Sequence, residues 1–96
     1  MANYTLSTAA VTDIVQIADY TIRKFGLVQA RKYRESLTST FELLSRHPEI
    51  GRDFSQLGPG WRRHPYHDHN IYYKQSSDGI LILRLLHSHQ DPGRHL

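Results

Sequence analysis

The sequence contains no cysteine, so disulfide bonds cannot stabilise the chain. Its 96 residues suffice for one domain, residues 1–96, with no internal repeat or second domain. A domain of this size withdraws only about 60–65% of its unfolded surface from water, which leaves a small core. Small domains usually compensate with disulfides, a metal or a partner subunit. Because disulfides are excluded, size alone favours a partner.

Long apolar runs and a leader are also missing. Met1–Leu6 lacks the basic and apolar segments of a signal peptide. No apolar run approaches the roughly 20 residues that a membrane span needs. We therefore expect a cytoplasmic protein without membrane contact.

Motifs of nucleophilic catalysis are absent as well. The chain has no Gly-x-Ser-x-Gly sequence and no phosphate-binding glycine loop. Ser7, Ser36, Ser39 and Ser45 occur where a helix would cap or expose them. The sequence therefore predicts neither a nucleophilic enzyme nor a cofactor.

Lysine is scarce, whereas arginine is abundant. Twelve Lys and Arg oppose nine Asp and Glu, which gives a formal net charge of +3, and nine of the twelve cations are arginine. A guanidinium makes planar, bidentate contacts with carboxylates and phosphates. The composition suggests an acidic partner or one associated with nucleic acid.

The N-terminal half has the periodicity of two amphipathic helices. Residues 4–6 are strand-like, and Ser7 or Thr8 is a suitable N-cap for a first helix that ends at Gly26. Its apolar stripe consists of Val11, Ile14, Ala18, Ile22 and Phe25. A second helix is predicted over about residues 27–46, and a single glycine between the two predicts an antiparallel hairpin. The apolar face of the second helix consists of Ala30, Tyr33, Leu37, Phe41 and Leu44.

The C-terminal half has the pattern of a sheet. His47-Pro48 ends the second helix, and the glycine-containing loop 51–60 follows. Strand-like segments then occupy residues 61–65, 69–75 and 80–87, of which the last two are joined by a tight Asp-Gly turn. The order β-α-α-β-β-β predicts an α+β fold in which the helical hairpin packs on one face of a small, mainly antiparallel sheet.

Residues 80–87 form a nearly continuous apolar run, typical of a central strand, yet the run contains Arg84. Burying a guanidinium is costly unless carboxylate or carbonyl groups receive it. Three interpretations are open: an internal ion pair, a strand position that reaches the open face of the sheet, or an anion-contacting arginine in a groove beside Arg62 and Arg63. The candidate partners for the ion pair are Glu49, Asp53 and Asp68.

Side-chain alternation sorts the last two strands onto faces. With an even turn between them, Arg84 and Leu86 share a face with Ile71 and Tyr73, while His87 lies on the other face. An odd turn would exchange these partners. In both cases Arg84 and His87 can line one pocket only if the strand twists, bulges or ends between them.

Trp61, Arg62, Arg63 and His64 form a basic cluster with an aromatic neighbour. Interleaved cations and aromatic rings suit nucleic acid or an acidic peptide, through phosphate pairing and stacking. The alternative is a solvated edge strand that its charges protect against aggregation.

Histidines are frequent toward the C-terminus. A metal could bind His87, His89 and Asp91 at alternate positions of a strand, but the paired ligand spacing of a zinc signature is missing. We therefore expect surface or partly buried histidines that respond to pH between about 5 and 7, and no metal. The histidines concerned are His64, His67, His69, His87, His89 and His95.

General acid–base cleavage of RNA needs no nucleophilic side chain. His87 could donate a proton, and Arg84 or Arg62 could stabilise the charge that develops on the phosphate. These three residues are the candidate catalytic set if the chain is a ribonuclease.

Taken together, the sequence resembles the ParE branch of the RelE/ParE family of bacterial type II toxins. The positions that carry the resemblance are Leu6, Ser7, Ala10, Asp13, Ile14, Ile17, Ala18, Tyr20, Phe25, Gly26, Gln29, Ala30, Tyr33, Leu44, Pro48, Ile50, Gly51, Arg52, Leu57, Gly60, Arg62, His69–Tyr73, Ile80–His87, Asp91 and Arg94. They cover almost the full length, and their joint order and spacing are specific. The β-α-α-β-β-β fold of the family agrees with the layout predicted from periodicity.

The resemblance implies a toxin that blocks DNA gyrase with the DNA broken and that is neutralised by a ParD-like antitoxin in a hetero-oligomer. Such a toxin acts by binding and is not an enzyme. A small basic domain with two exposed helices suits the disordered, acidic and amphipathic segment of such an antitoxin. The candidate partner-binding residues are Arg31, Arg34, Arg62, Arg63, Arg84 and His87.

Two alternatives remain. RelE-type relatives cleave messenger RNA on the ribosome, and Arg62, Arg84 and His87 fall near the positions where such a site would be built. The RelE branch is rich in lysine in its middle segment, whereas no lysine occurs here between Gly51 and Pro65. The other alternative is a toxin-like remnant that has kept only antitoxin binding.

Overall fold

The computed structural model describes residues 3–95, apart from the side chain of His95. The elements in chain order are β1 (Asn3–Leu6), α1 (Thr8–Phe25), α2 (Leu27–Arg46), the 3-10 turn η1 (Pro48–Ile50), β2 (Arg52–Asp53), the 3-10 turn η2 (Ser55–Leu57), β3 (Arg62–Tyr66), β4 (His69–Ser76), β5 (Gly79–His87) and α3 (Pro92–His95). The predicted α+β order is confirmed, with β2 as an additional short strand.

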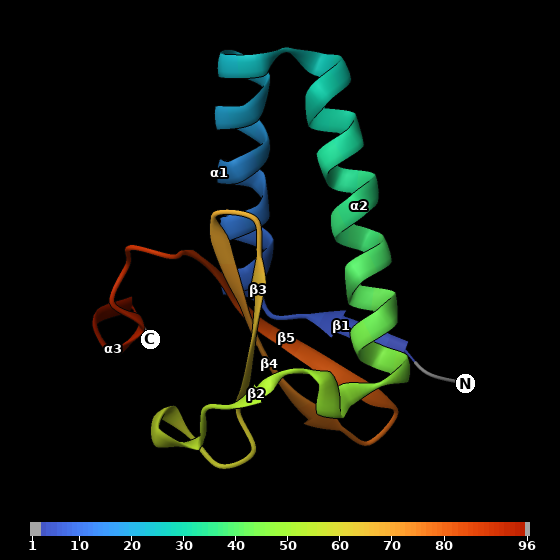
Figure 1. The fold of residues 1–96 in the computed structure, drawn as a ribbon, viewed down its shortest axis with the longest axis vertical. Helices are drawn as coiled ribbons and strands as arrows, with labels where there is room; N and C mark the ends of the chain where they lie inside the picture. Colours follow the sequence, from blue (N-terminus) through green and yellow to red (C-terminus); the bar gives the residue numbers. More distant parts are fainter. Residues whose placement is uncertain (1–2, 96) are drawn as a thin grey trace.

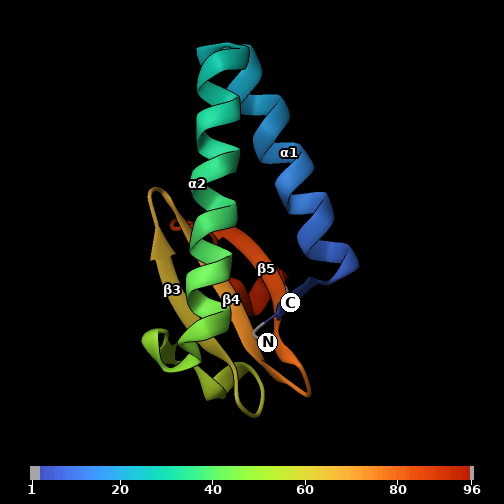
Figure 2. The ribbon, with the colours of Figure 1, turned by 90° about the vertical axis from the view of Figure 1, so that its right-hand side faces the viewer.

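The sheet has the strand order β1-β5-β4-β3-β2. β1 pairs with β5 in parallel, and the other neighbours are antiparallel. The helices connect β1 to the rest of the sheet as an antiparallel hairpin (Figure 1). In both ribbon views the lower part of this hairpin lies beside the sheet, and its tip extends beyond the sheet (Figures 1 and 2).

The start of α1 and the break between the helices have simple local causes. The Ser7 side chain caps α1 by accepting a hydrogen bond from the Ala10 amide at 3.0 Å. Gly26 ends α1 with a φ of 91°, a conformation that side chains other than glycine rarely adopt. The predicted N-cap and the predicted helix break are therefore confirmed.

The core lies between α2 and the helix-facing side of the sheet. Its buried members are Ala10, Leu37, Phe41, Leu44, Tyr66, Ile71, Tyr73, Ile80, Ile82 and Leu85. The Tyr73 hydroxyl donates to the Pro48 carbonyl at 2.7 Å and accepts from the Gly51 amide at 2.8 Å, which anchors the turn after α2. A Cβ atom at Gly51 would collide with the Tyr73 ring, so this close approach requires glycine.

The apolar stripe of α1 is oriented differently from that of α2. Val11, Ile22 and Phe25 are 45%, 41% and 60% exposed, whereas the buried residues of α1 include Ala10 and Asp13. The inner face of α1 is thus rotated away from its most apolar face. Much of the stripe that the sequence offers to a core lies on the surface instead.

A β-bulge changes the alternation predicted for β5. The turn at residues 77–78 is even, but Tyr73 pairs with Ile82 while Tyr72 pairs with Arg84. Leu83 is therefore an extra residue, and the residues beyond it are shifted by one position. Leu85 joins Ile71 in the core cluster, so the prediction that Arg84 and Leu86 share the face of Ile71 is wrong.

The burial of α2 yields a stability prediction. Phe41 is 2% exposed and Leu37 is 3% exposed, so replacing either by alanine should leave a cavity. We expect each variant to lose about 2–5 kcal/mol of unfolding free energy in urea denaturation. Val28→Ala is the control, because Val28 is 69% exposed and its replacement should cost less than about 0.5 kcal/mol. Unchanged stability in Phe41→Ala would show instead that this stripe is a docking surface.

Candidate functional site

The site is organised by an ion pair between the first helix and the last strand. The Asp13 carboxylate accepts from Arg84 Nε at 2.8 Å and from Arg84 Nη2 at 2.9 Å. It also accepts from the backbone amide of Leu85 at 3.0 Å. Asp13 is 8% exposed, so one buried carboxylate receives three donors. This bidentate geometry is the strong form of an arginine–carboxylate contact.

These contacts occur just beyond the point where β1, the strand paired with this edge of β5, ends. β1 ends at Leu6, opposite Ile82, so the next residues of β5 have no strand beside them on that edge. The Ser7 amide donates to the Ile82 carbonyl at 2.9 Å, and the Ser7 hydroxyl donates to the Leu83 carbonyl at 2.7 Å. Ser7 and Asp13 thus take the place of a continuing strand, and they join the start of α1 to the edge of β5.

The ion pair explains the arginine in the apolar strand. The interpretation as an internal ion pair is confirmed, but the carboxylate is that of Asp13, which is not one of the three predicted partners. The pKa of Arg84 is raised, first by the hydrogen bond to Asp13, so the guanidinium stays charged. A signal for Asp13 exists in the sequence, because it lies three residues after Ala10 and four before Ile17, on the inner face of α1.

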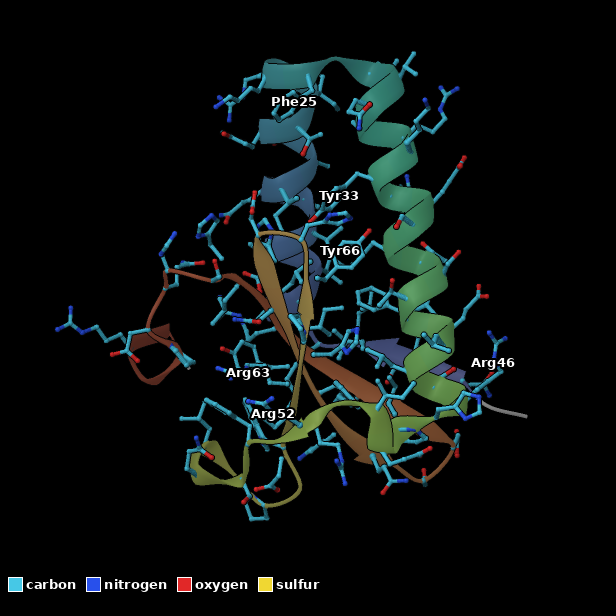
Figure 3. The ribbon with its side chains drawn as sticks, in the orientation of Figure 1. Phe25, Tyr33, Arg46, Arg52, Arg63 and Tyr66 are labelled. Atoms are coloured by element: carbon cyan, nitrogen blue, oxygen red, sulfur yellow. The ribbon has the colours of Figure 1, made fainter. Side chains whose placement is uncertain are left out.

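A cleft of about 830 Å³ lies beside this ion pair. Its walls come from α1, from Tyr33 of α2, from the β3–β4 turn and from the end of β5. Arg84 and His87 both line the cleft, and the bulge in β5 lies just before Arg84, not between these two residues. Figure 3 shows Tyr33 and Tyr66 close together above the sheet, where their ring centroids are 5.4 Å apart.

Tyrosine and histidine side chains form a contact network in the cleft. The Tyr33 hydroxyl lies 3.3 Å from His69 Nδ1, and the His69 and His87 rings meet edge to face at 5.4 Å. Burial is the main cause that raises the pKa of Tyr33 to about 12, so this phenol is protonated at neutral pH. Burial, followed by the neighbouring His87, lowers the pKa of His69. His69 is therefore uncharged at neutral pH.

The three residues of the candidate ribonuclease set are not brought together. Arg84 and His87 share the cleft, but Arg62 lies on β3 and donates to the Gly51 carbonyl at 2.6 Å. Arg62 is not among the residues that line the cleft. Arg63, next to it, places its guanidinium 4.8 Å from the centre of the Phe54 ring.

The histidines do not form a ligand set in the part of the chain that the structure describes. No three His, Asp or Glu side chains converge there in a way that could hold a metal ion. The rings of His87 and His89 stack at 5.1 Å, and His87 Nδ1 accepts from the His89 amide at 3.2 Å. The side chain of His95 lies outside the described residues.

An apolar groove of about 510 Å³ runs between the two helices and shares Ile17, Thr21 and Tyr33 with the cleft. Val11, Val15 and Ile22 of α1 contribute to it and are 45%, 53% and 41% exposed. Arg31 and Arg34 of α2 also line the groove, so two of the predicted partner-binding residues border apolar surface. The apolar stripe of α1 is exposed in this groove, so only a second molecule could bury it.

Neither α1 nor α2, nor any other helix within residues 3–95, is apolar enough over its length to span a membrane.

The fold and these surfaces agree with comparisons to known proteins. The sequence profile described as "ParE toxin of type II toxin-antitoxin system, parDE" matches residues 4–92. The chain is 31% identical to Toxin ParE1 of Caulobacter vibrioides over 96 residues, covering 100% of this chain and 99% of that protein. It is 30% identical to Toxin ParE1 of Mycobacterium tuberculosis, covering 99% and 98%.

The fold has a solved counterpart in a structure titled "Chromosomal ParDE TA system from P. aeruginosa". The TM-score is 0.75 and the identity 19%, over 91% of this chain and 96% of that chain. This chain therefore shares the fold of that solved chain. By its profile match and its relatives, the chain belongs to the ParE toxin family of type II toxin–antitoxin systems.

The lowered pKa of His69 predicts a pH dependence. The unfolded chain binds a proton near the ordinary value of 6.5, whereas the folded chain binds it only at lower pH. The contribution of His69 to the free energy of unfolding is therefore fully present above about pH 6.5. It is lost as the pH falls from there toward the lowered pKa. The groups that act on His69 are His87, Asp68, Asp13 and His67.

Urea denaturation between pH 7.5 and 5 measures this effect. His69→Gln should have a smaller loss of stability than the wild type, because the titrating group is gone. A part of the loss should remain, since burial also lowers the pKa of His64. The control His47→Gln removes an exposed histidine and should keep the full pH dependence. An identical pH profile in wild type and His69→Gln would contradict the assignment.

Proposed function

We propose that this protein is a cytoplasmic toxin that inhibits DNA gyrase and is neutralised by a ParD-like antitoxin. Membership of the ParE family supports both parts of this proposal. The observation that carries the antitoxin part is the open apolar groove along α1. Three aliphatic side chains of a folded domain, Val11, Val15 and Ile22, are each more than 40% exposed in one groove.

The groove has features that suit an amphipathic acidic segment. Its floor is apolar, and Arg31 and Arg34 supply positive charge beside it. An amphipathic helix binds such a groove with its apolar face and can pair acidic side chains with the flanking arginines. The net charge of +3 adds a favourable long-range attraction. Binding would also stabilise the small core by mass action, in a toxin–antitoxin hetero-oligomer.

The alternative is a RelE-like endoribonuclease. It is supported by the placement of His87 and Arg84 in one cleft, near the protonated phenol of Tyr33. Against it, the guanidinium of Arg84 is already bound to Asp13, and Arg62 is bound to a backbone carbonyl outside the cleft. A cation that is engaged in this way offers less stabilisation to a phosphate in a transition state.

A gyrase supercoiling assay with purified components tests the proposal. The toxin should inhibit supercoiling and leave broken DNA, while messenger RNA incubated with ribosomes stays intact. The ParD-like antitoxin should restore supercoiling. Cleaved RNA with normal supercoiling would favour the ribonuclease, and antitoxin binding without either effect would indicate a remnant.

The groove variant Val15→Glu separates the two parts of the proposal. It should still inhibit gyrase but bind the antitoxin about 30-fold more weakly or worse, because an unpaired charge would be buried at a cost of about 2 kcal/mol or more. Thr12→Glu is the matched control, since Thr12 is an exposed residue of α1 outside the groove. Equal antitoxin affinity in wild type and Val15→Glu would contradict the assigned groove.

A further inference from the structure

Two arginines lie directly opposite each other at the edge of the sheet. β2 consists only of Arg52 and Asp53, and Arg52 pairs with Arg63 of β3. Like charges in directly opposed positions of an antiparallel pair are unfavourable. Figure 3 shows the two side chains next to each other beside β2 and β3. Such an arrangement is favourable when an anion binds between the guanidinium groups.

No carboxylate relieves this repulsion within residues 3–94. The ion pairs in that range are His47–Glu49, Asp13–Arg84 and Asp91–Arg94, none of which includes Arg52 or Arg63. Asp53, the neighbour of Arg52, accepts a hydrogen bond from the Ser55 hydroxyl at 3.0 Å instead. The carboxylate of Asp53 is therefore hydrogen-bonded to Ser55 and does not form an ion pair with Arg52 or Arg63.

A small cavity of about 250 Å³ lies between the two arginines. Its other lining residues are Ile50, His64, Pro65 and Asn70. The residues that line the cavity thus include two arginines, a histidine and an asparagine, and none of them is acidic. This size and set of donors fit a single tetrahedral oxyanion, which guanidinium groups bind through paired hydrogen bonds.

The arginine on β3 is held in place before any ligand binds. The Arg63 guanidinium lies 4.8 Å from the centre of the Phe54 ring, and the Phe54 ring meets the ring of Tyr72 edge to face at 5.5 Å. Tyr72 is 1% exposed, so the stack rests on a buried side chain. A positioned guanidinium loses less conformational entropy on binding than a free one.

The position of the cavity favours a polymer over a free ion. β2 is the outermost strand of the sheet, so the pair of Arg52 and Arg63 lies at an open edge, and Trp61 lies two residues before Arg63. Paired arginines at an open edge with an aromatic neighbour match the backbone of a nucleic acid. An acidic amphipathic peptide fits the apolar groove between α1 and α2 better than this cavity.

We propose that Arg52 and Arg63, with His64 and Asn70, form a binding site for the phosphodiester backbone of duplex DNA. The choice of DNA rests on the proposed action on gyrase, which holds DNA, whereas the phosphate site itself rests on the arginine pair. The site gives the toxin a direct contact with DNA, separate from its groove for the antitoxin. The contact is with phosphates, so it is independent of DNA sequence.

Fluorescence anisotropy with a labelled 20-base-pair duplex, in the absence of gyrase, tests the site. We expect Arg52→Gln/Arg63→Gln to bind about tenfold more weakly or worse at low salt. The slope of log K against log salt concentration should also fall by about 1 to 2, since each neutralised phosphate contributes about 0.9. Arg52→Gln alone should show about half of this change. This single variant keeps the Arg63–Phe54 stack, so it can replace the double variant if that one is unstable.

The matched control is Arg46→Gln/Arg94→Gln, which removes two exposed arginines elsewhere and the same charge. It should keep the wild-type slope. An equal loss in this control would show a diffuse charge effect and overturn the site. Tight binding of inorganic phosphate without duplex binding, or a clear preference for a single-stranded RNA of equal length, would overturn the assignment to DNA.

Because gyrase is absent from the binding assay, the two proposals fail separately. DNA binding that depends on Arg52 and Arg63 supports the site even if supercoiling is not inhibited. Inhibition of gyrase with unchanged DNA binding in Arg52→Gln/Arg63→Gln would leave the proposed function intact and overturn the site.

Discussion

The arrangement of this protein depends on the buried carboxylate of Asp13. It joins Arg84 and the amide of Leu85 to the first helix across 71 residues of sequence. A buried charge is costly to leave unpaired, so each partner stabilises the position of the other. Together with Ser7, this contact covers the part of the β5 edge that β1 does not reach. It thereby fixes the start of α1 against the sheet. The cleft lies directly beside this contact.

Only part of the apolar surface of the helical hairpin is buried in the core. Leu37, Phe41 and Leu44 of α2 are buried, whereas α1 leaves Val11 and Val15 in solvent, and the hairpin tip extends beyond the sheet (Figure 2). A chain without disulfides that keeps this much apolar surface outside its core is well suited to a partner that completes it. The chain belongs to a family of toxins from toxin–antitoxin systems, which is why we propose an antitoxin as the occupant of the groove.

The sequence predicted the elements well because their signals are local. The bounds of both helices and the hairpin turn follow from apolar periodicity, Ser7 and Gly26. Periodicity identifies an apolar stripe on α1, but it cannot tell whether a sheet or solvent lies against it. The bulge at Leu83 and the partner of Arg84 depend on contacts between distant segments, so one sequence carries little information about them.

The candidate site shows the same division. Arg84 and His87 line the same cleft although the bulge lies before Arg84 and not between the two residues, whereas Arg62 belongs to another surface. The pairing of Arg52 with Arg63 could not be predicted, because a two-residue strand has no periodic pattern. The basic cluster at residues 61–64 was recognised from composition, and only the register of the sheet shows which arginine faces which.

Native-state hydrogen exchange at the Leu85 amide tests the role of Asp13 most directly. We expect this amide to be protected in the wild type nearly as well as the core of β4 and β5. In Asp13→Asn its protection should fall by a factor of about 30 or more, equivalent to about 2 kcal/mol, because the charged acceptor is lost. Asp19→Asn, an exposed change on the same helix, should leave it unchanged. Rapid exchange of Leu85 in the wild type, or equal protection in Asp13→Asn, would contradict the account.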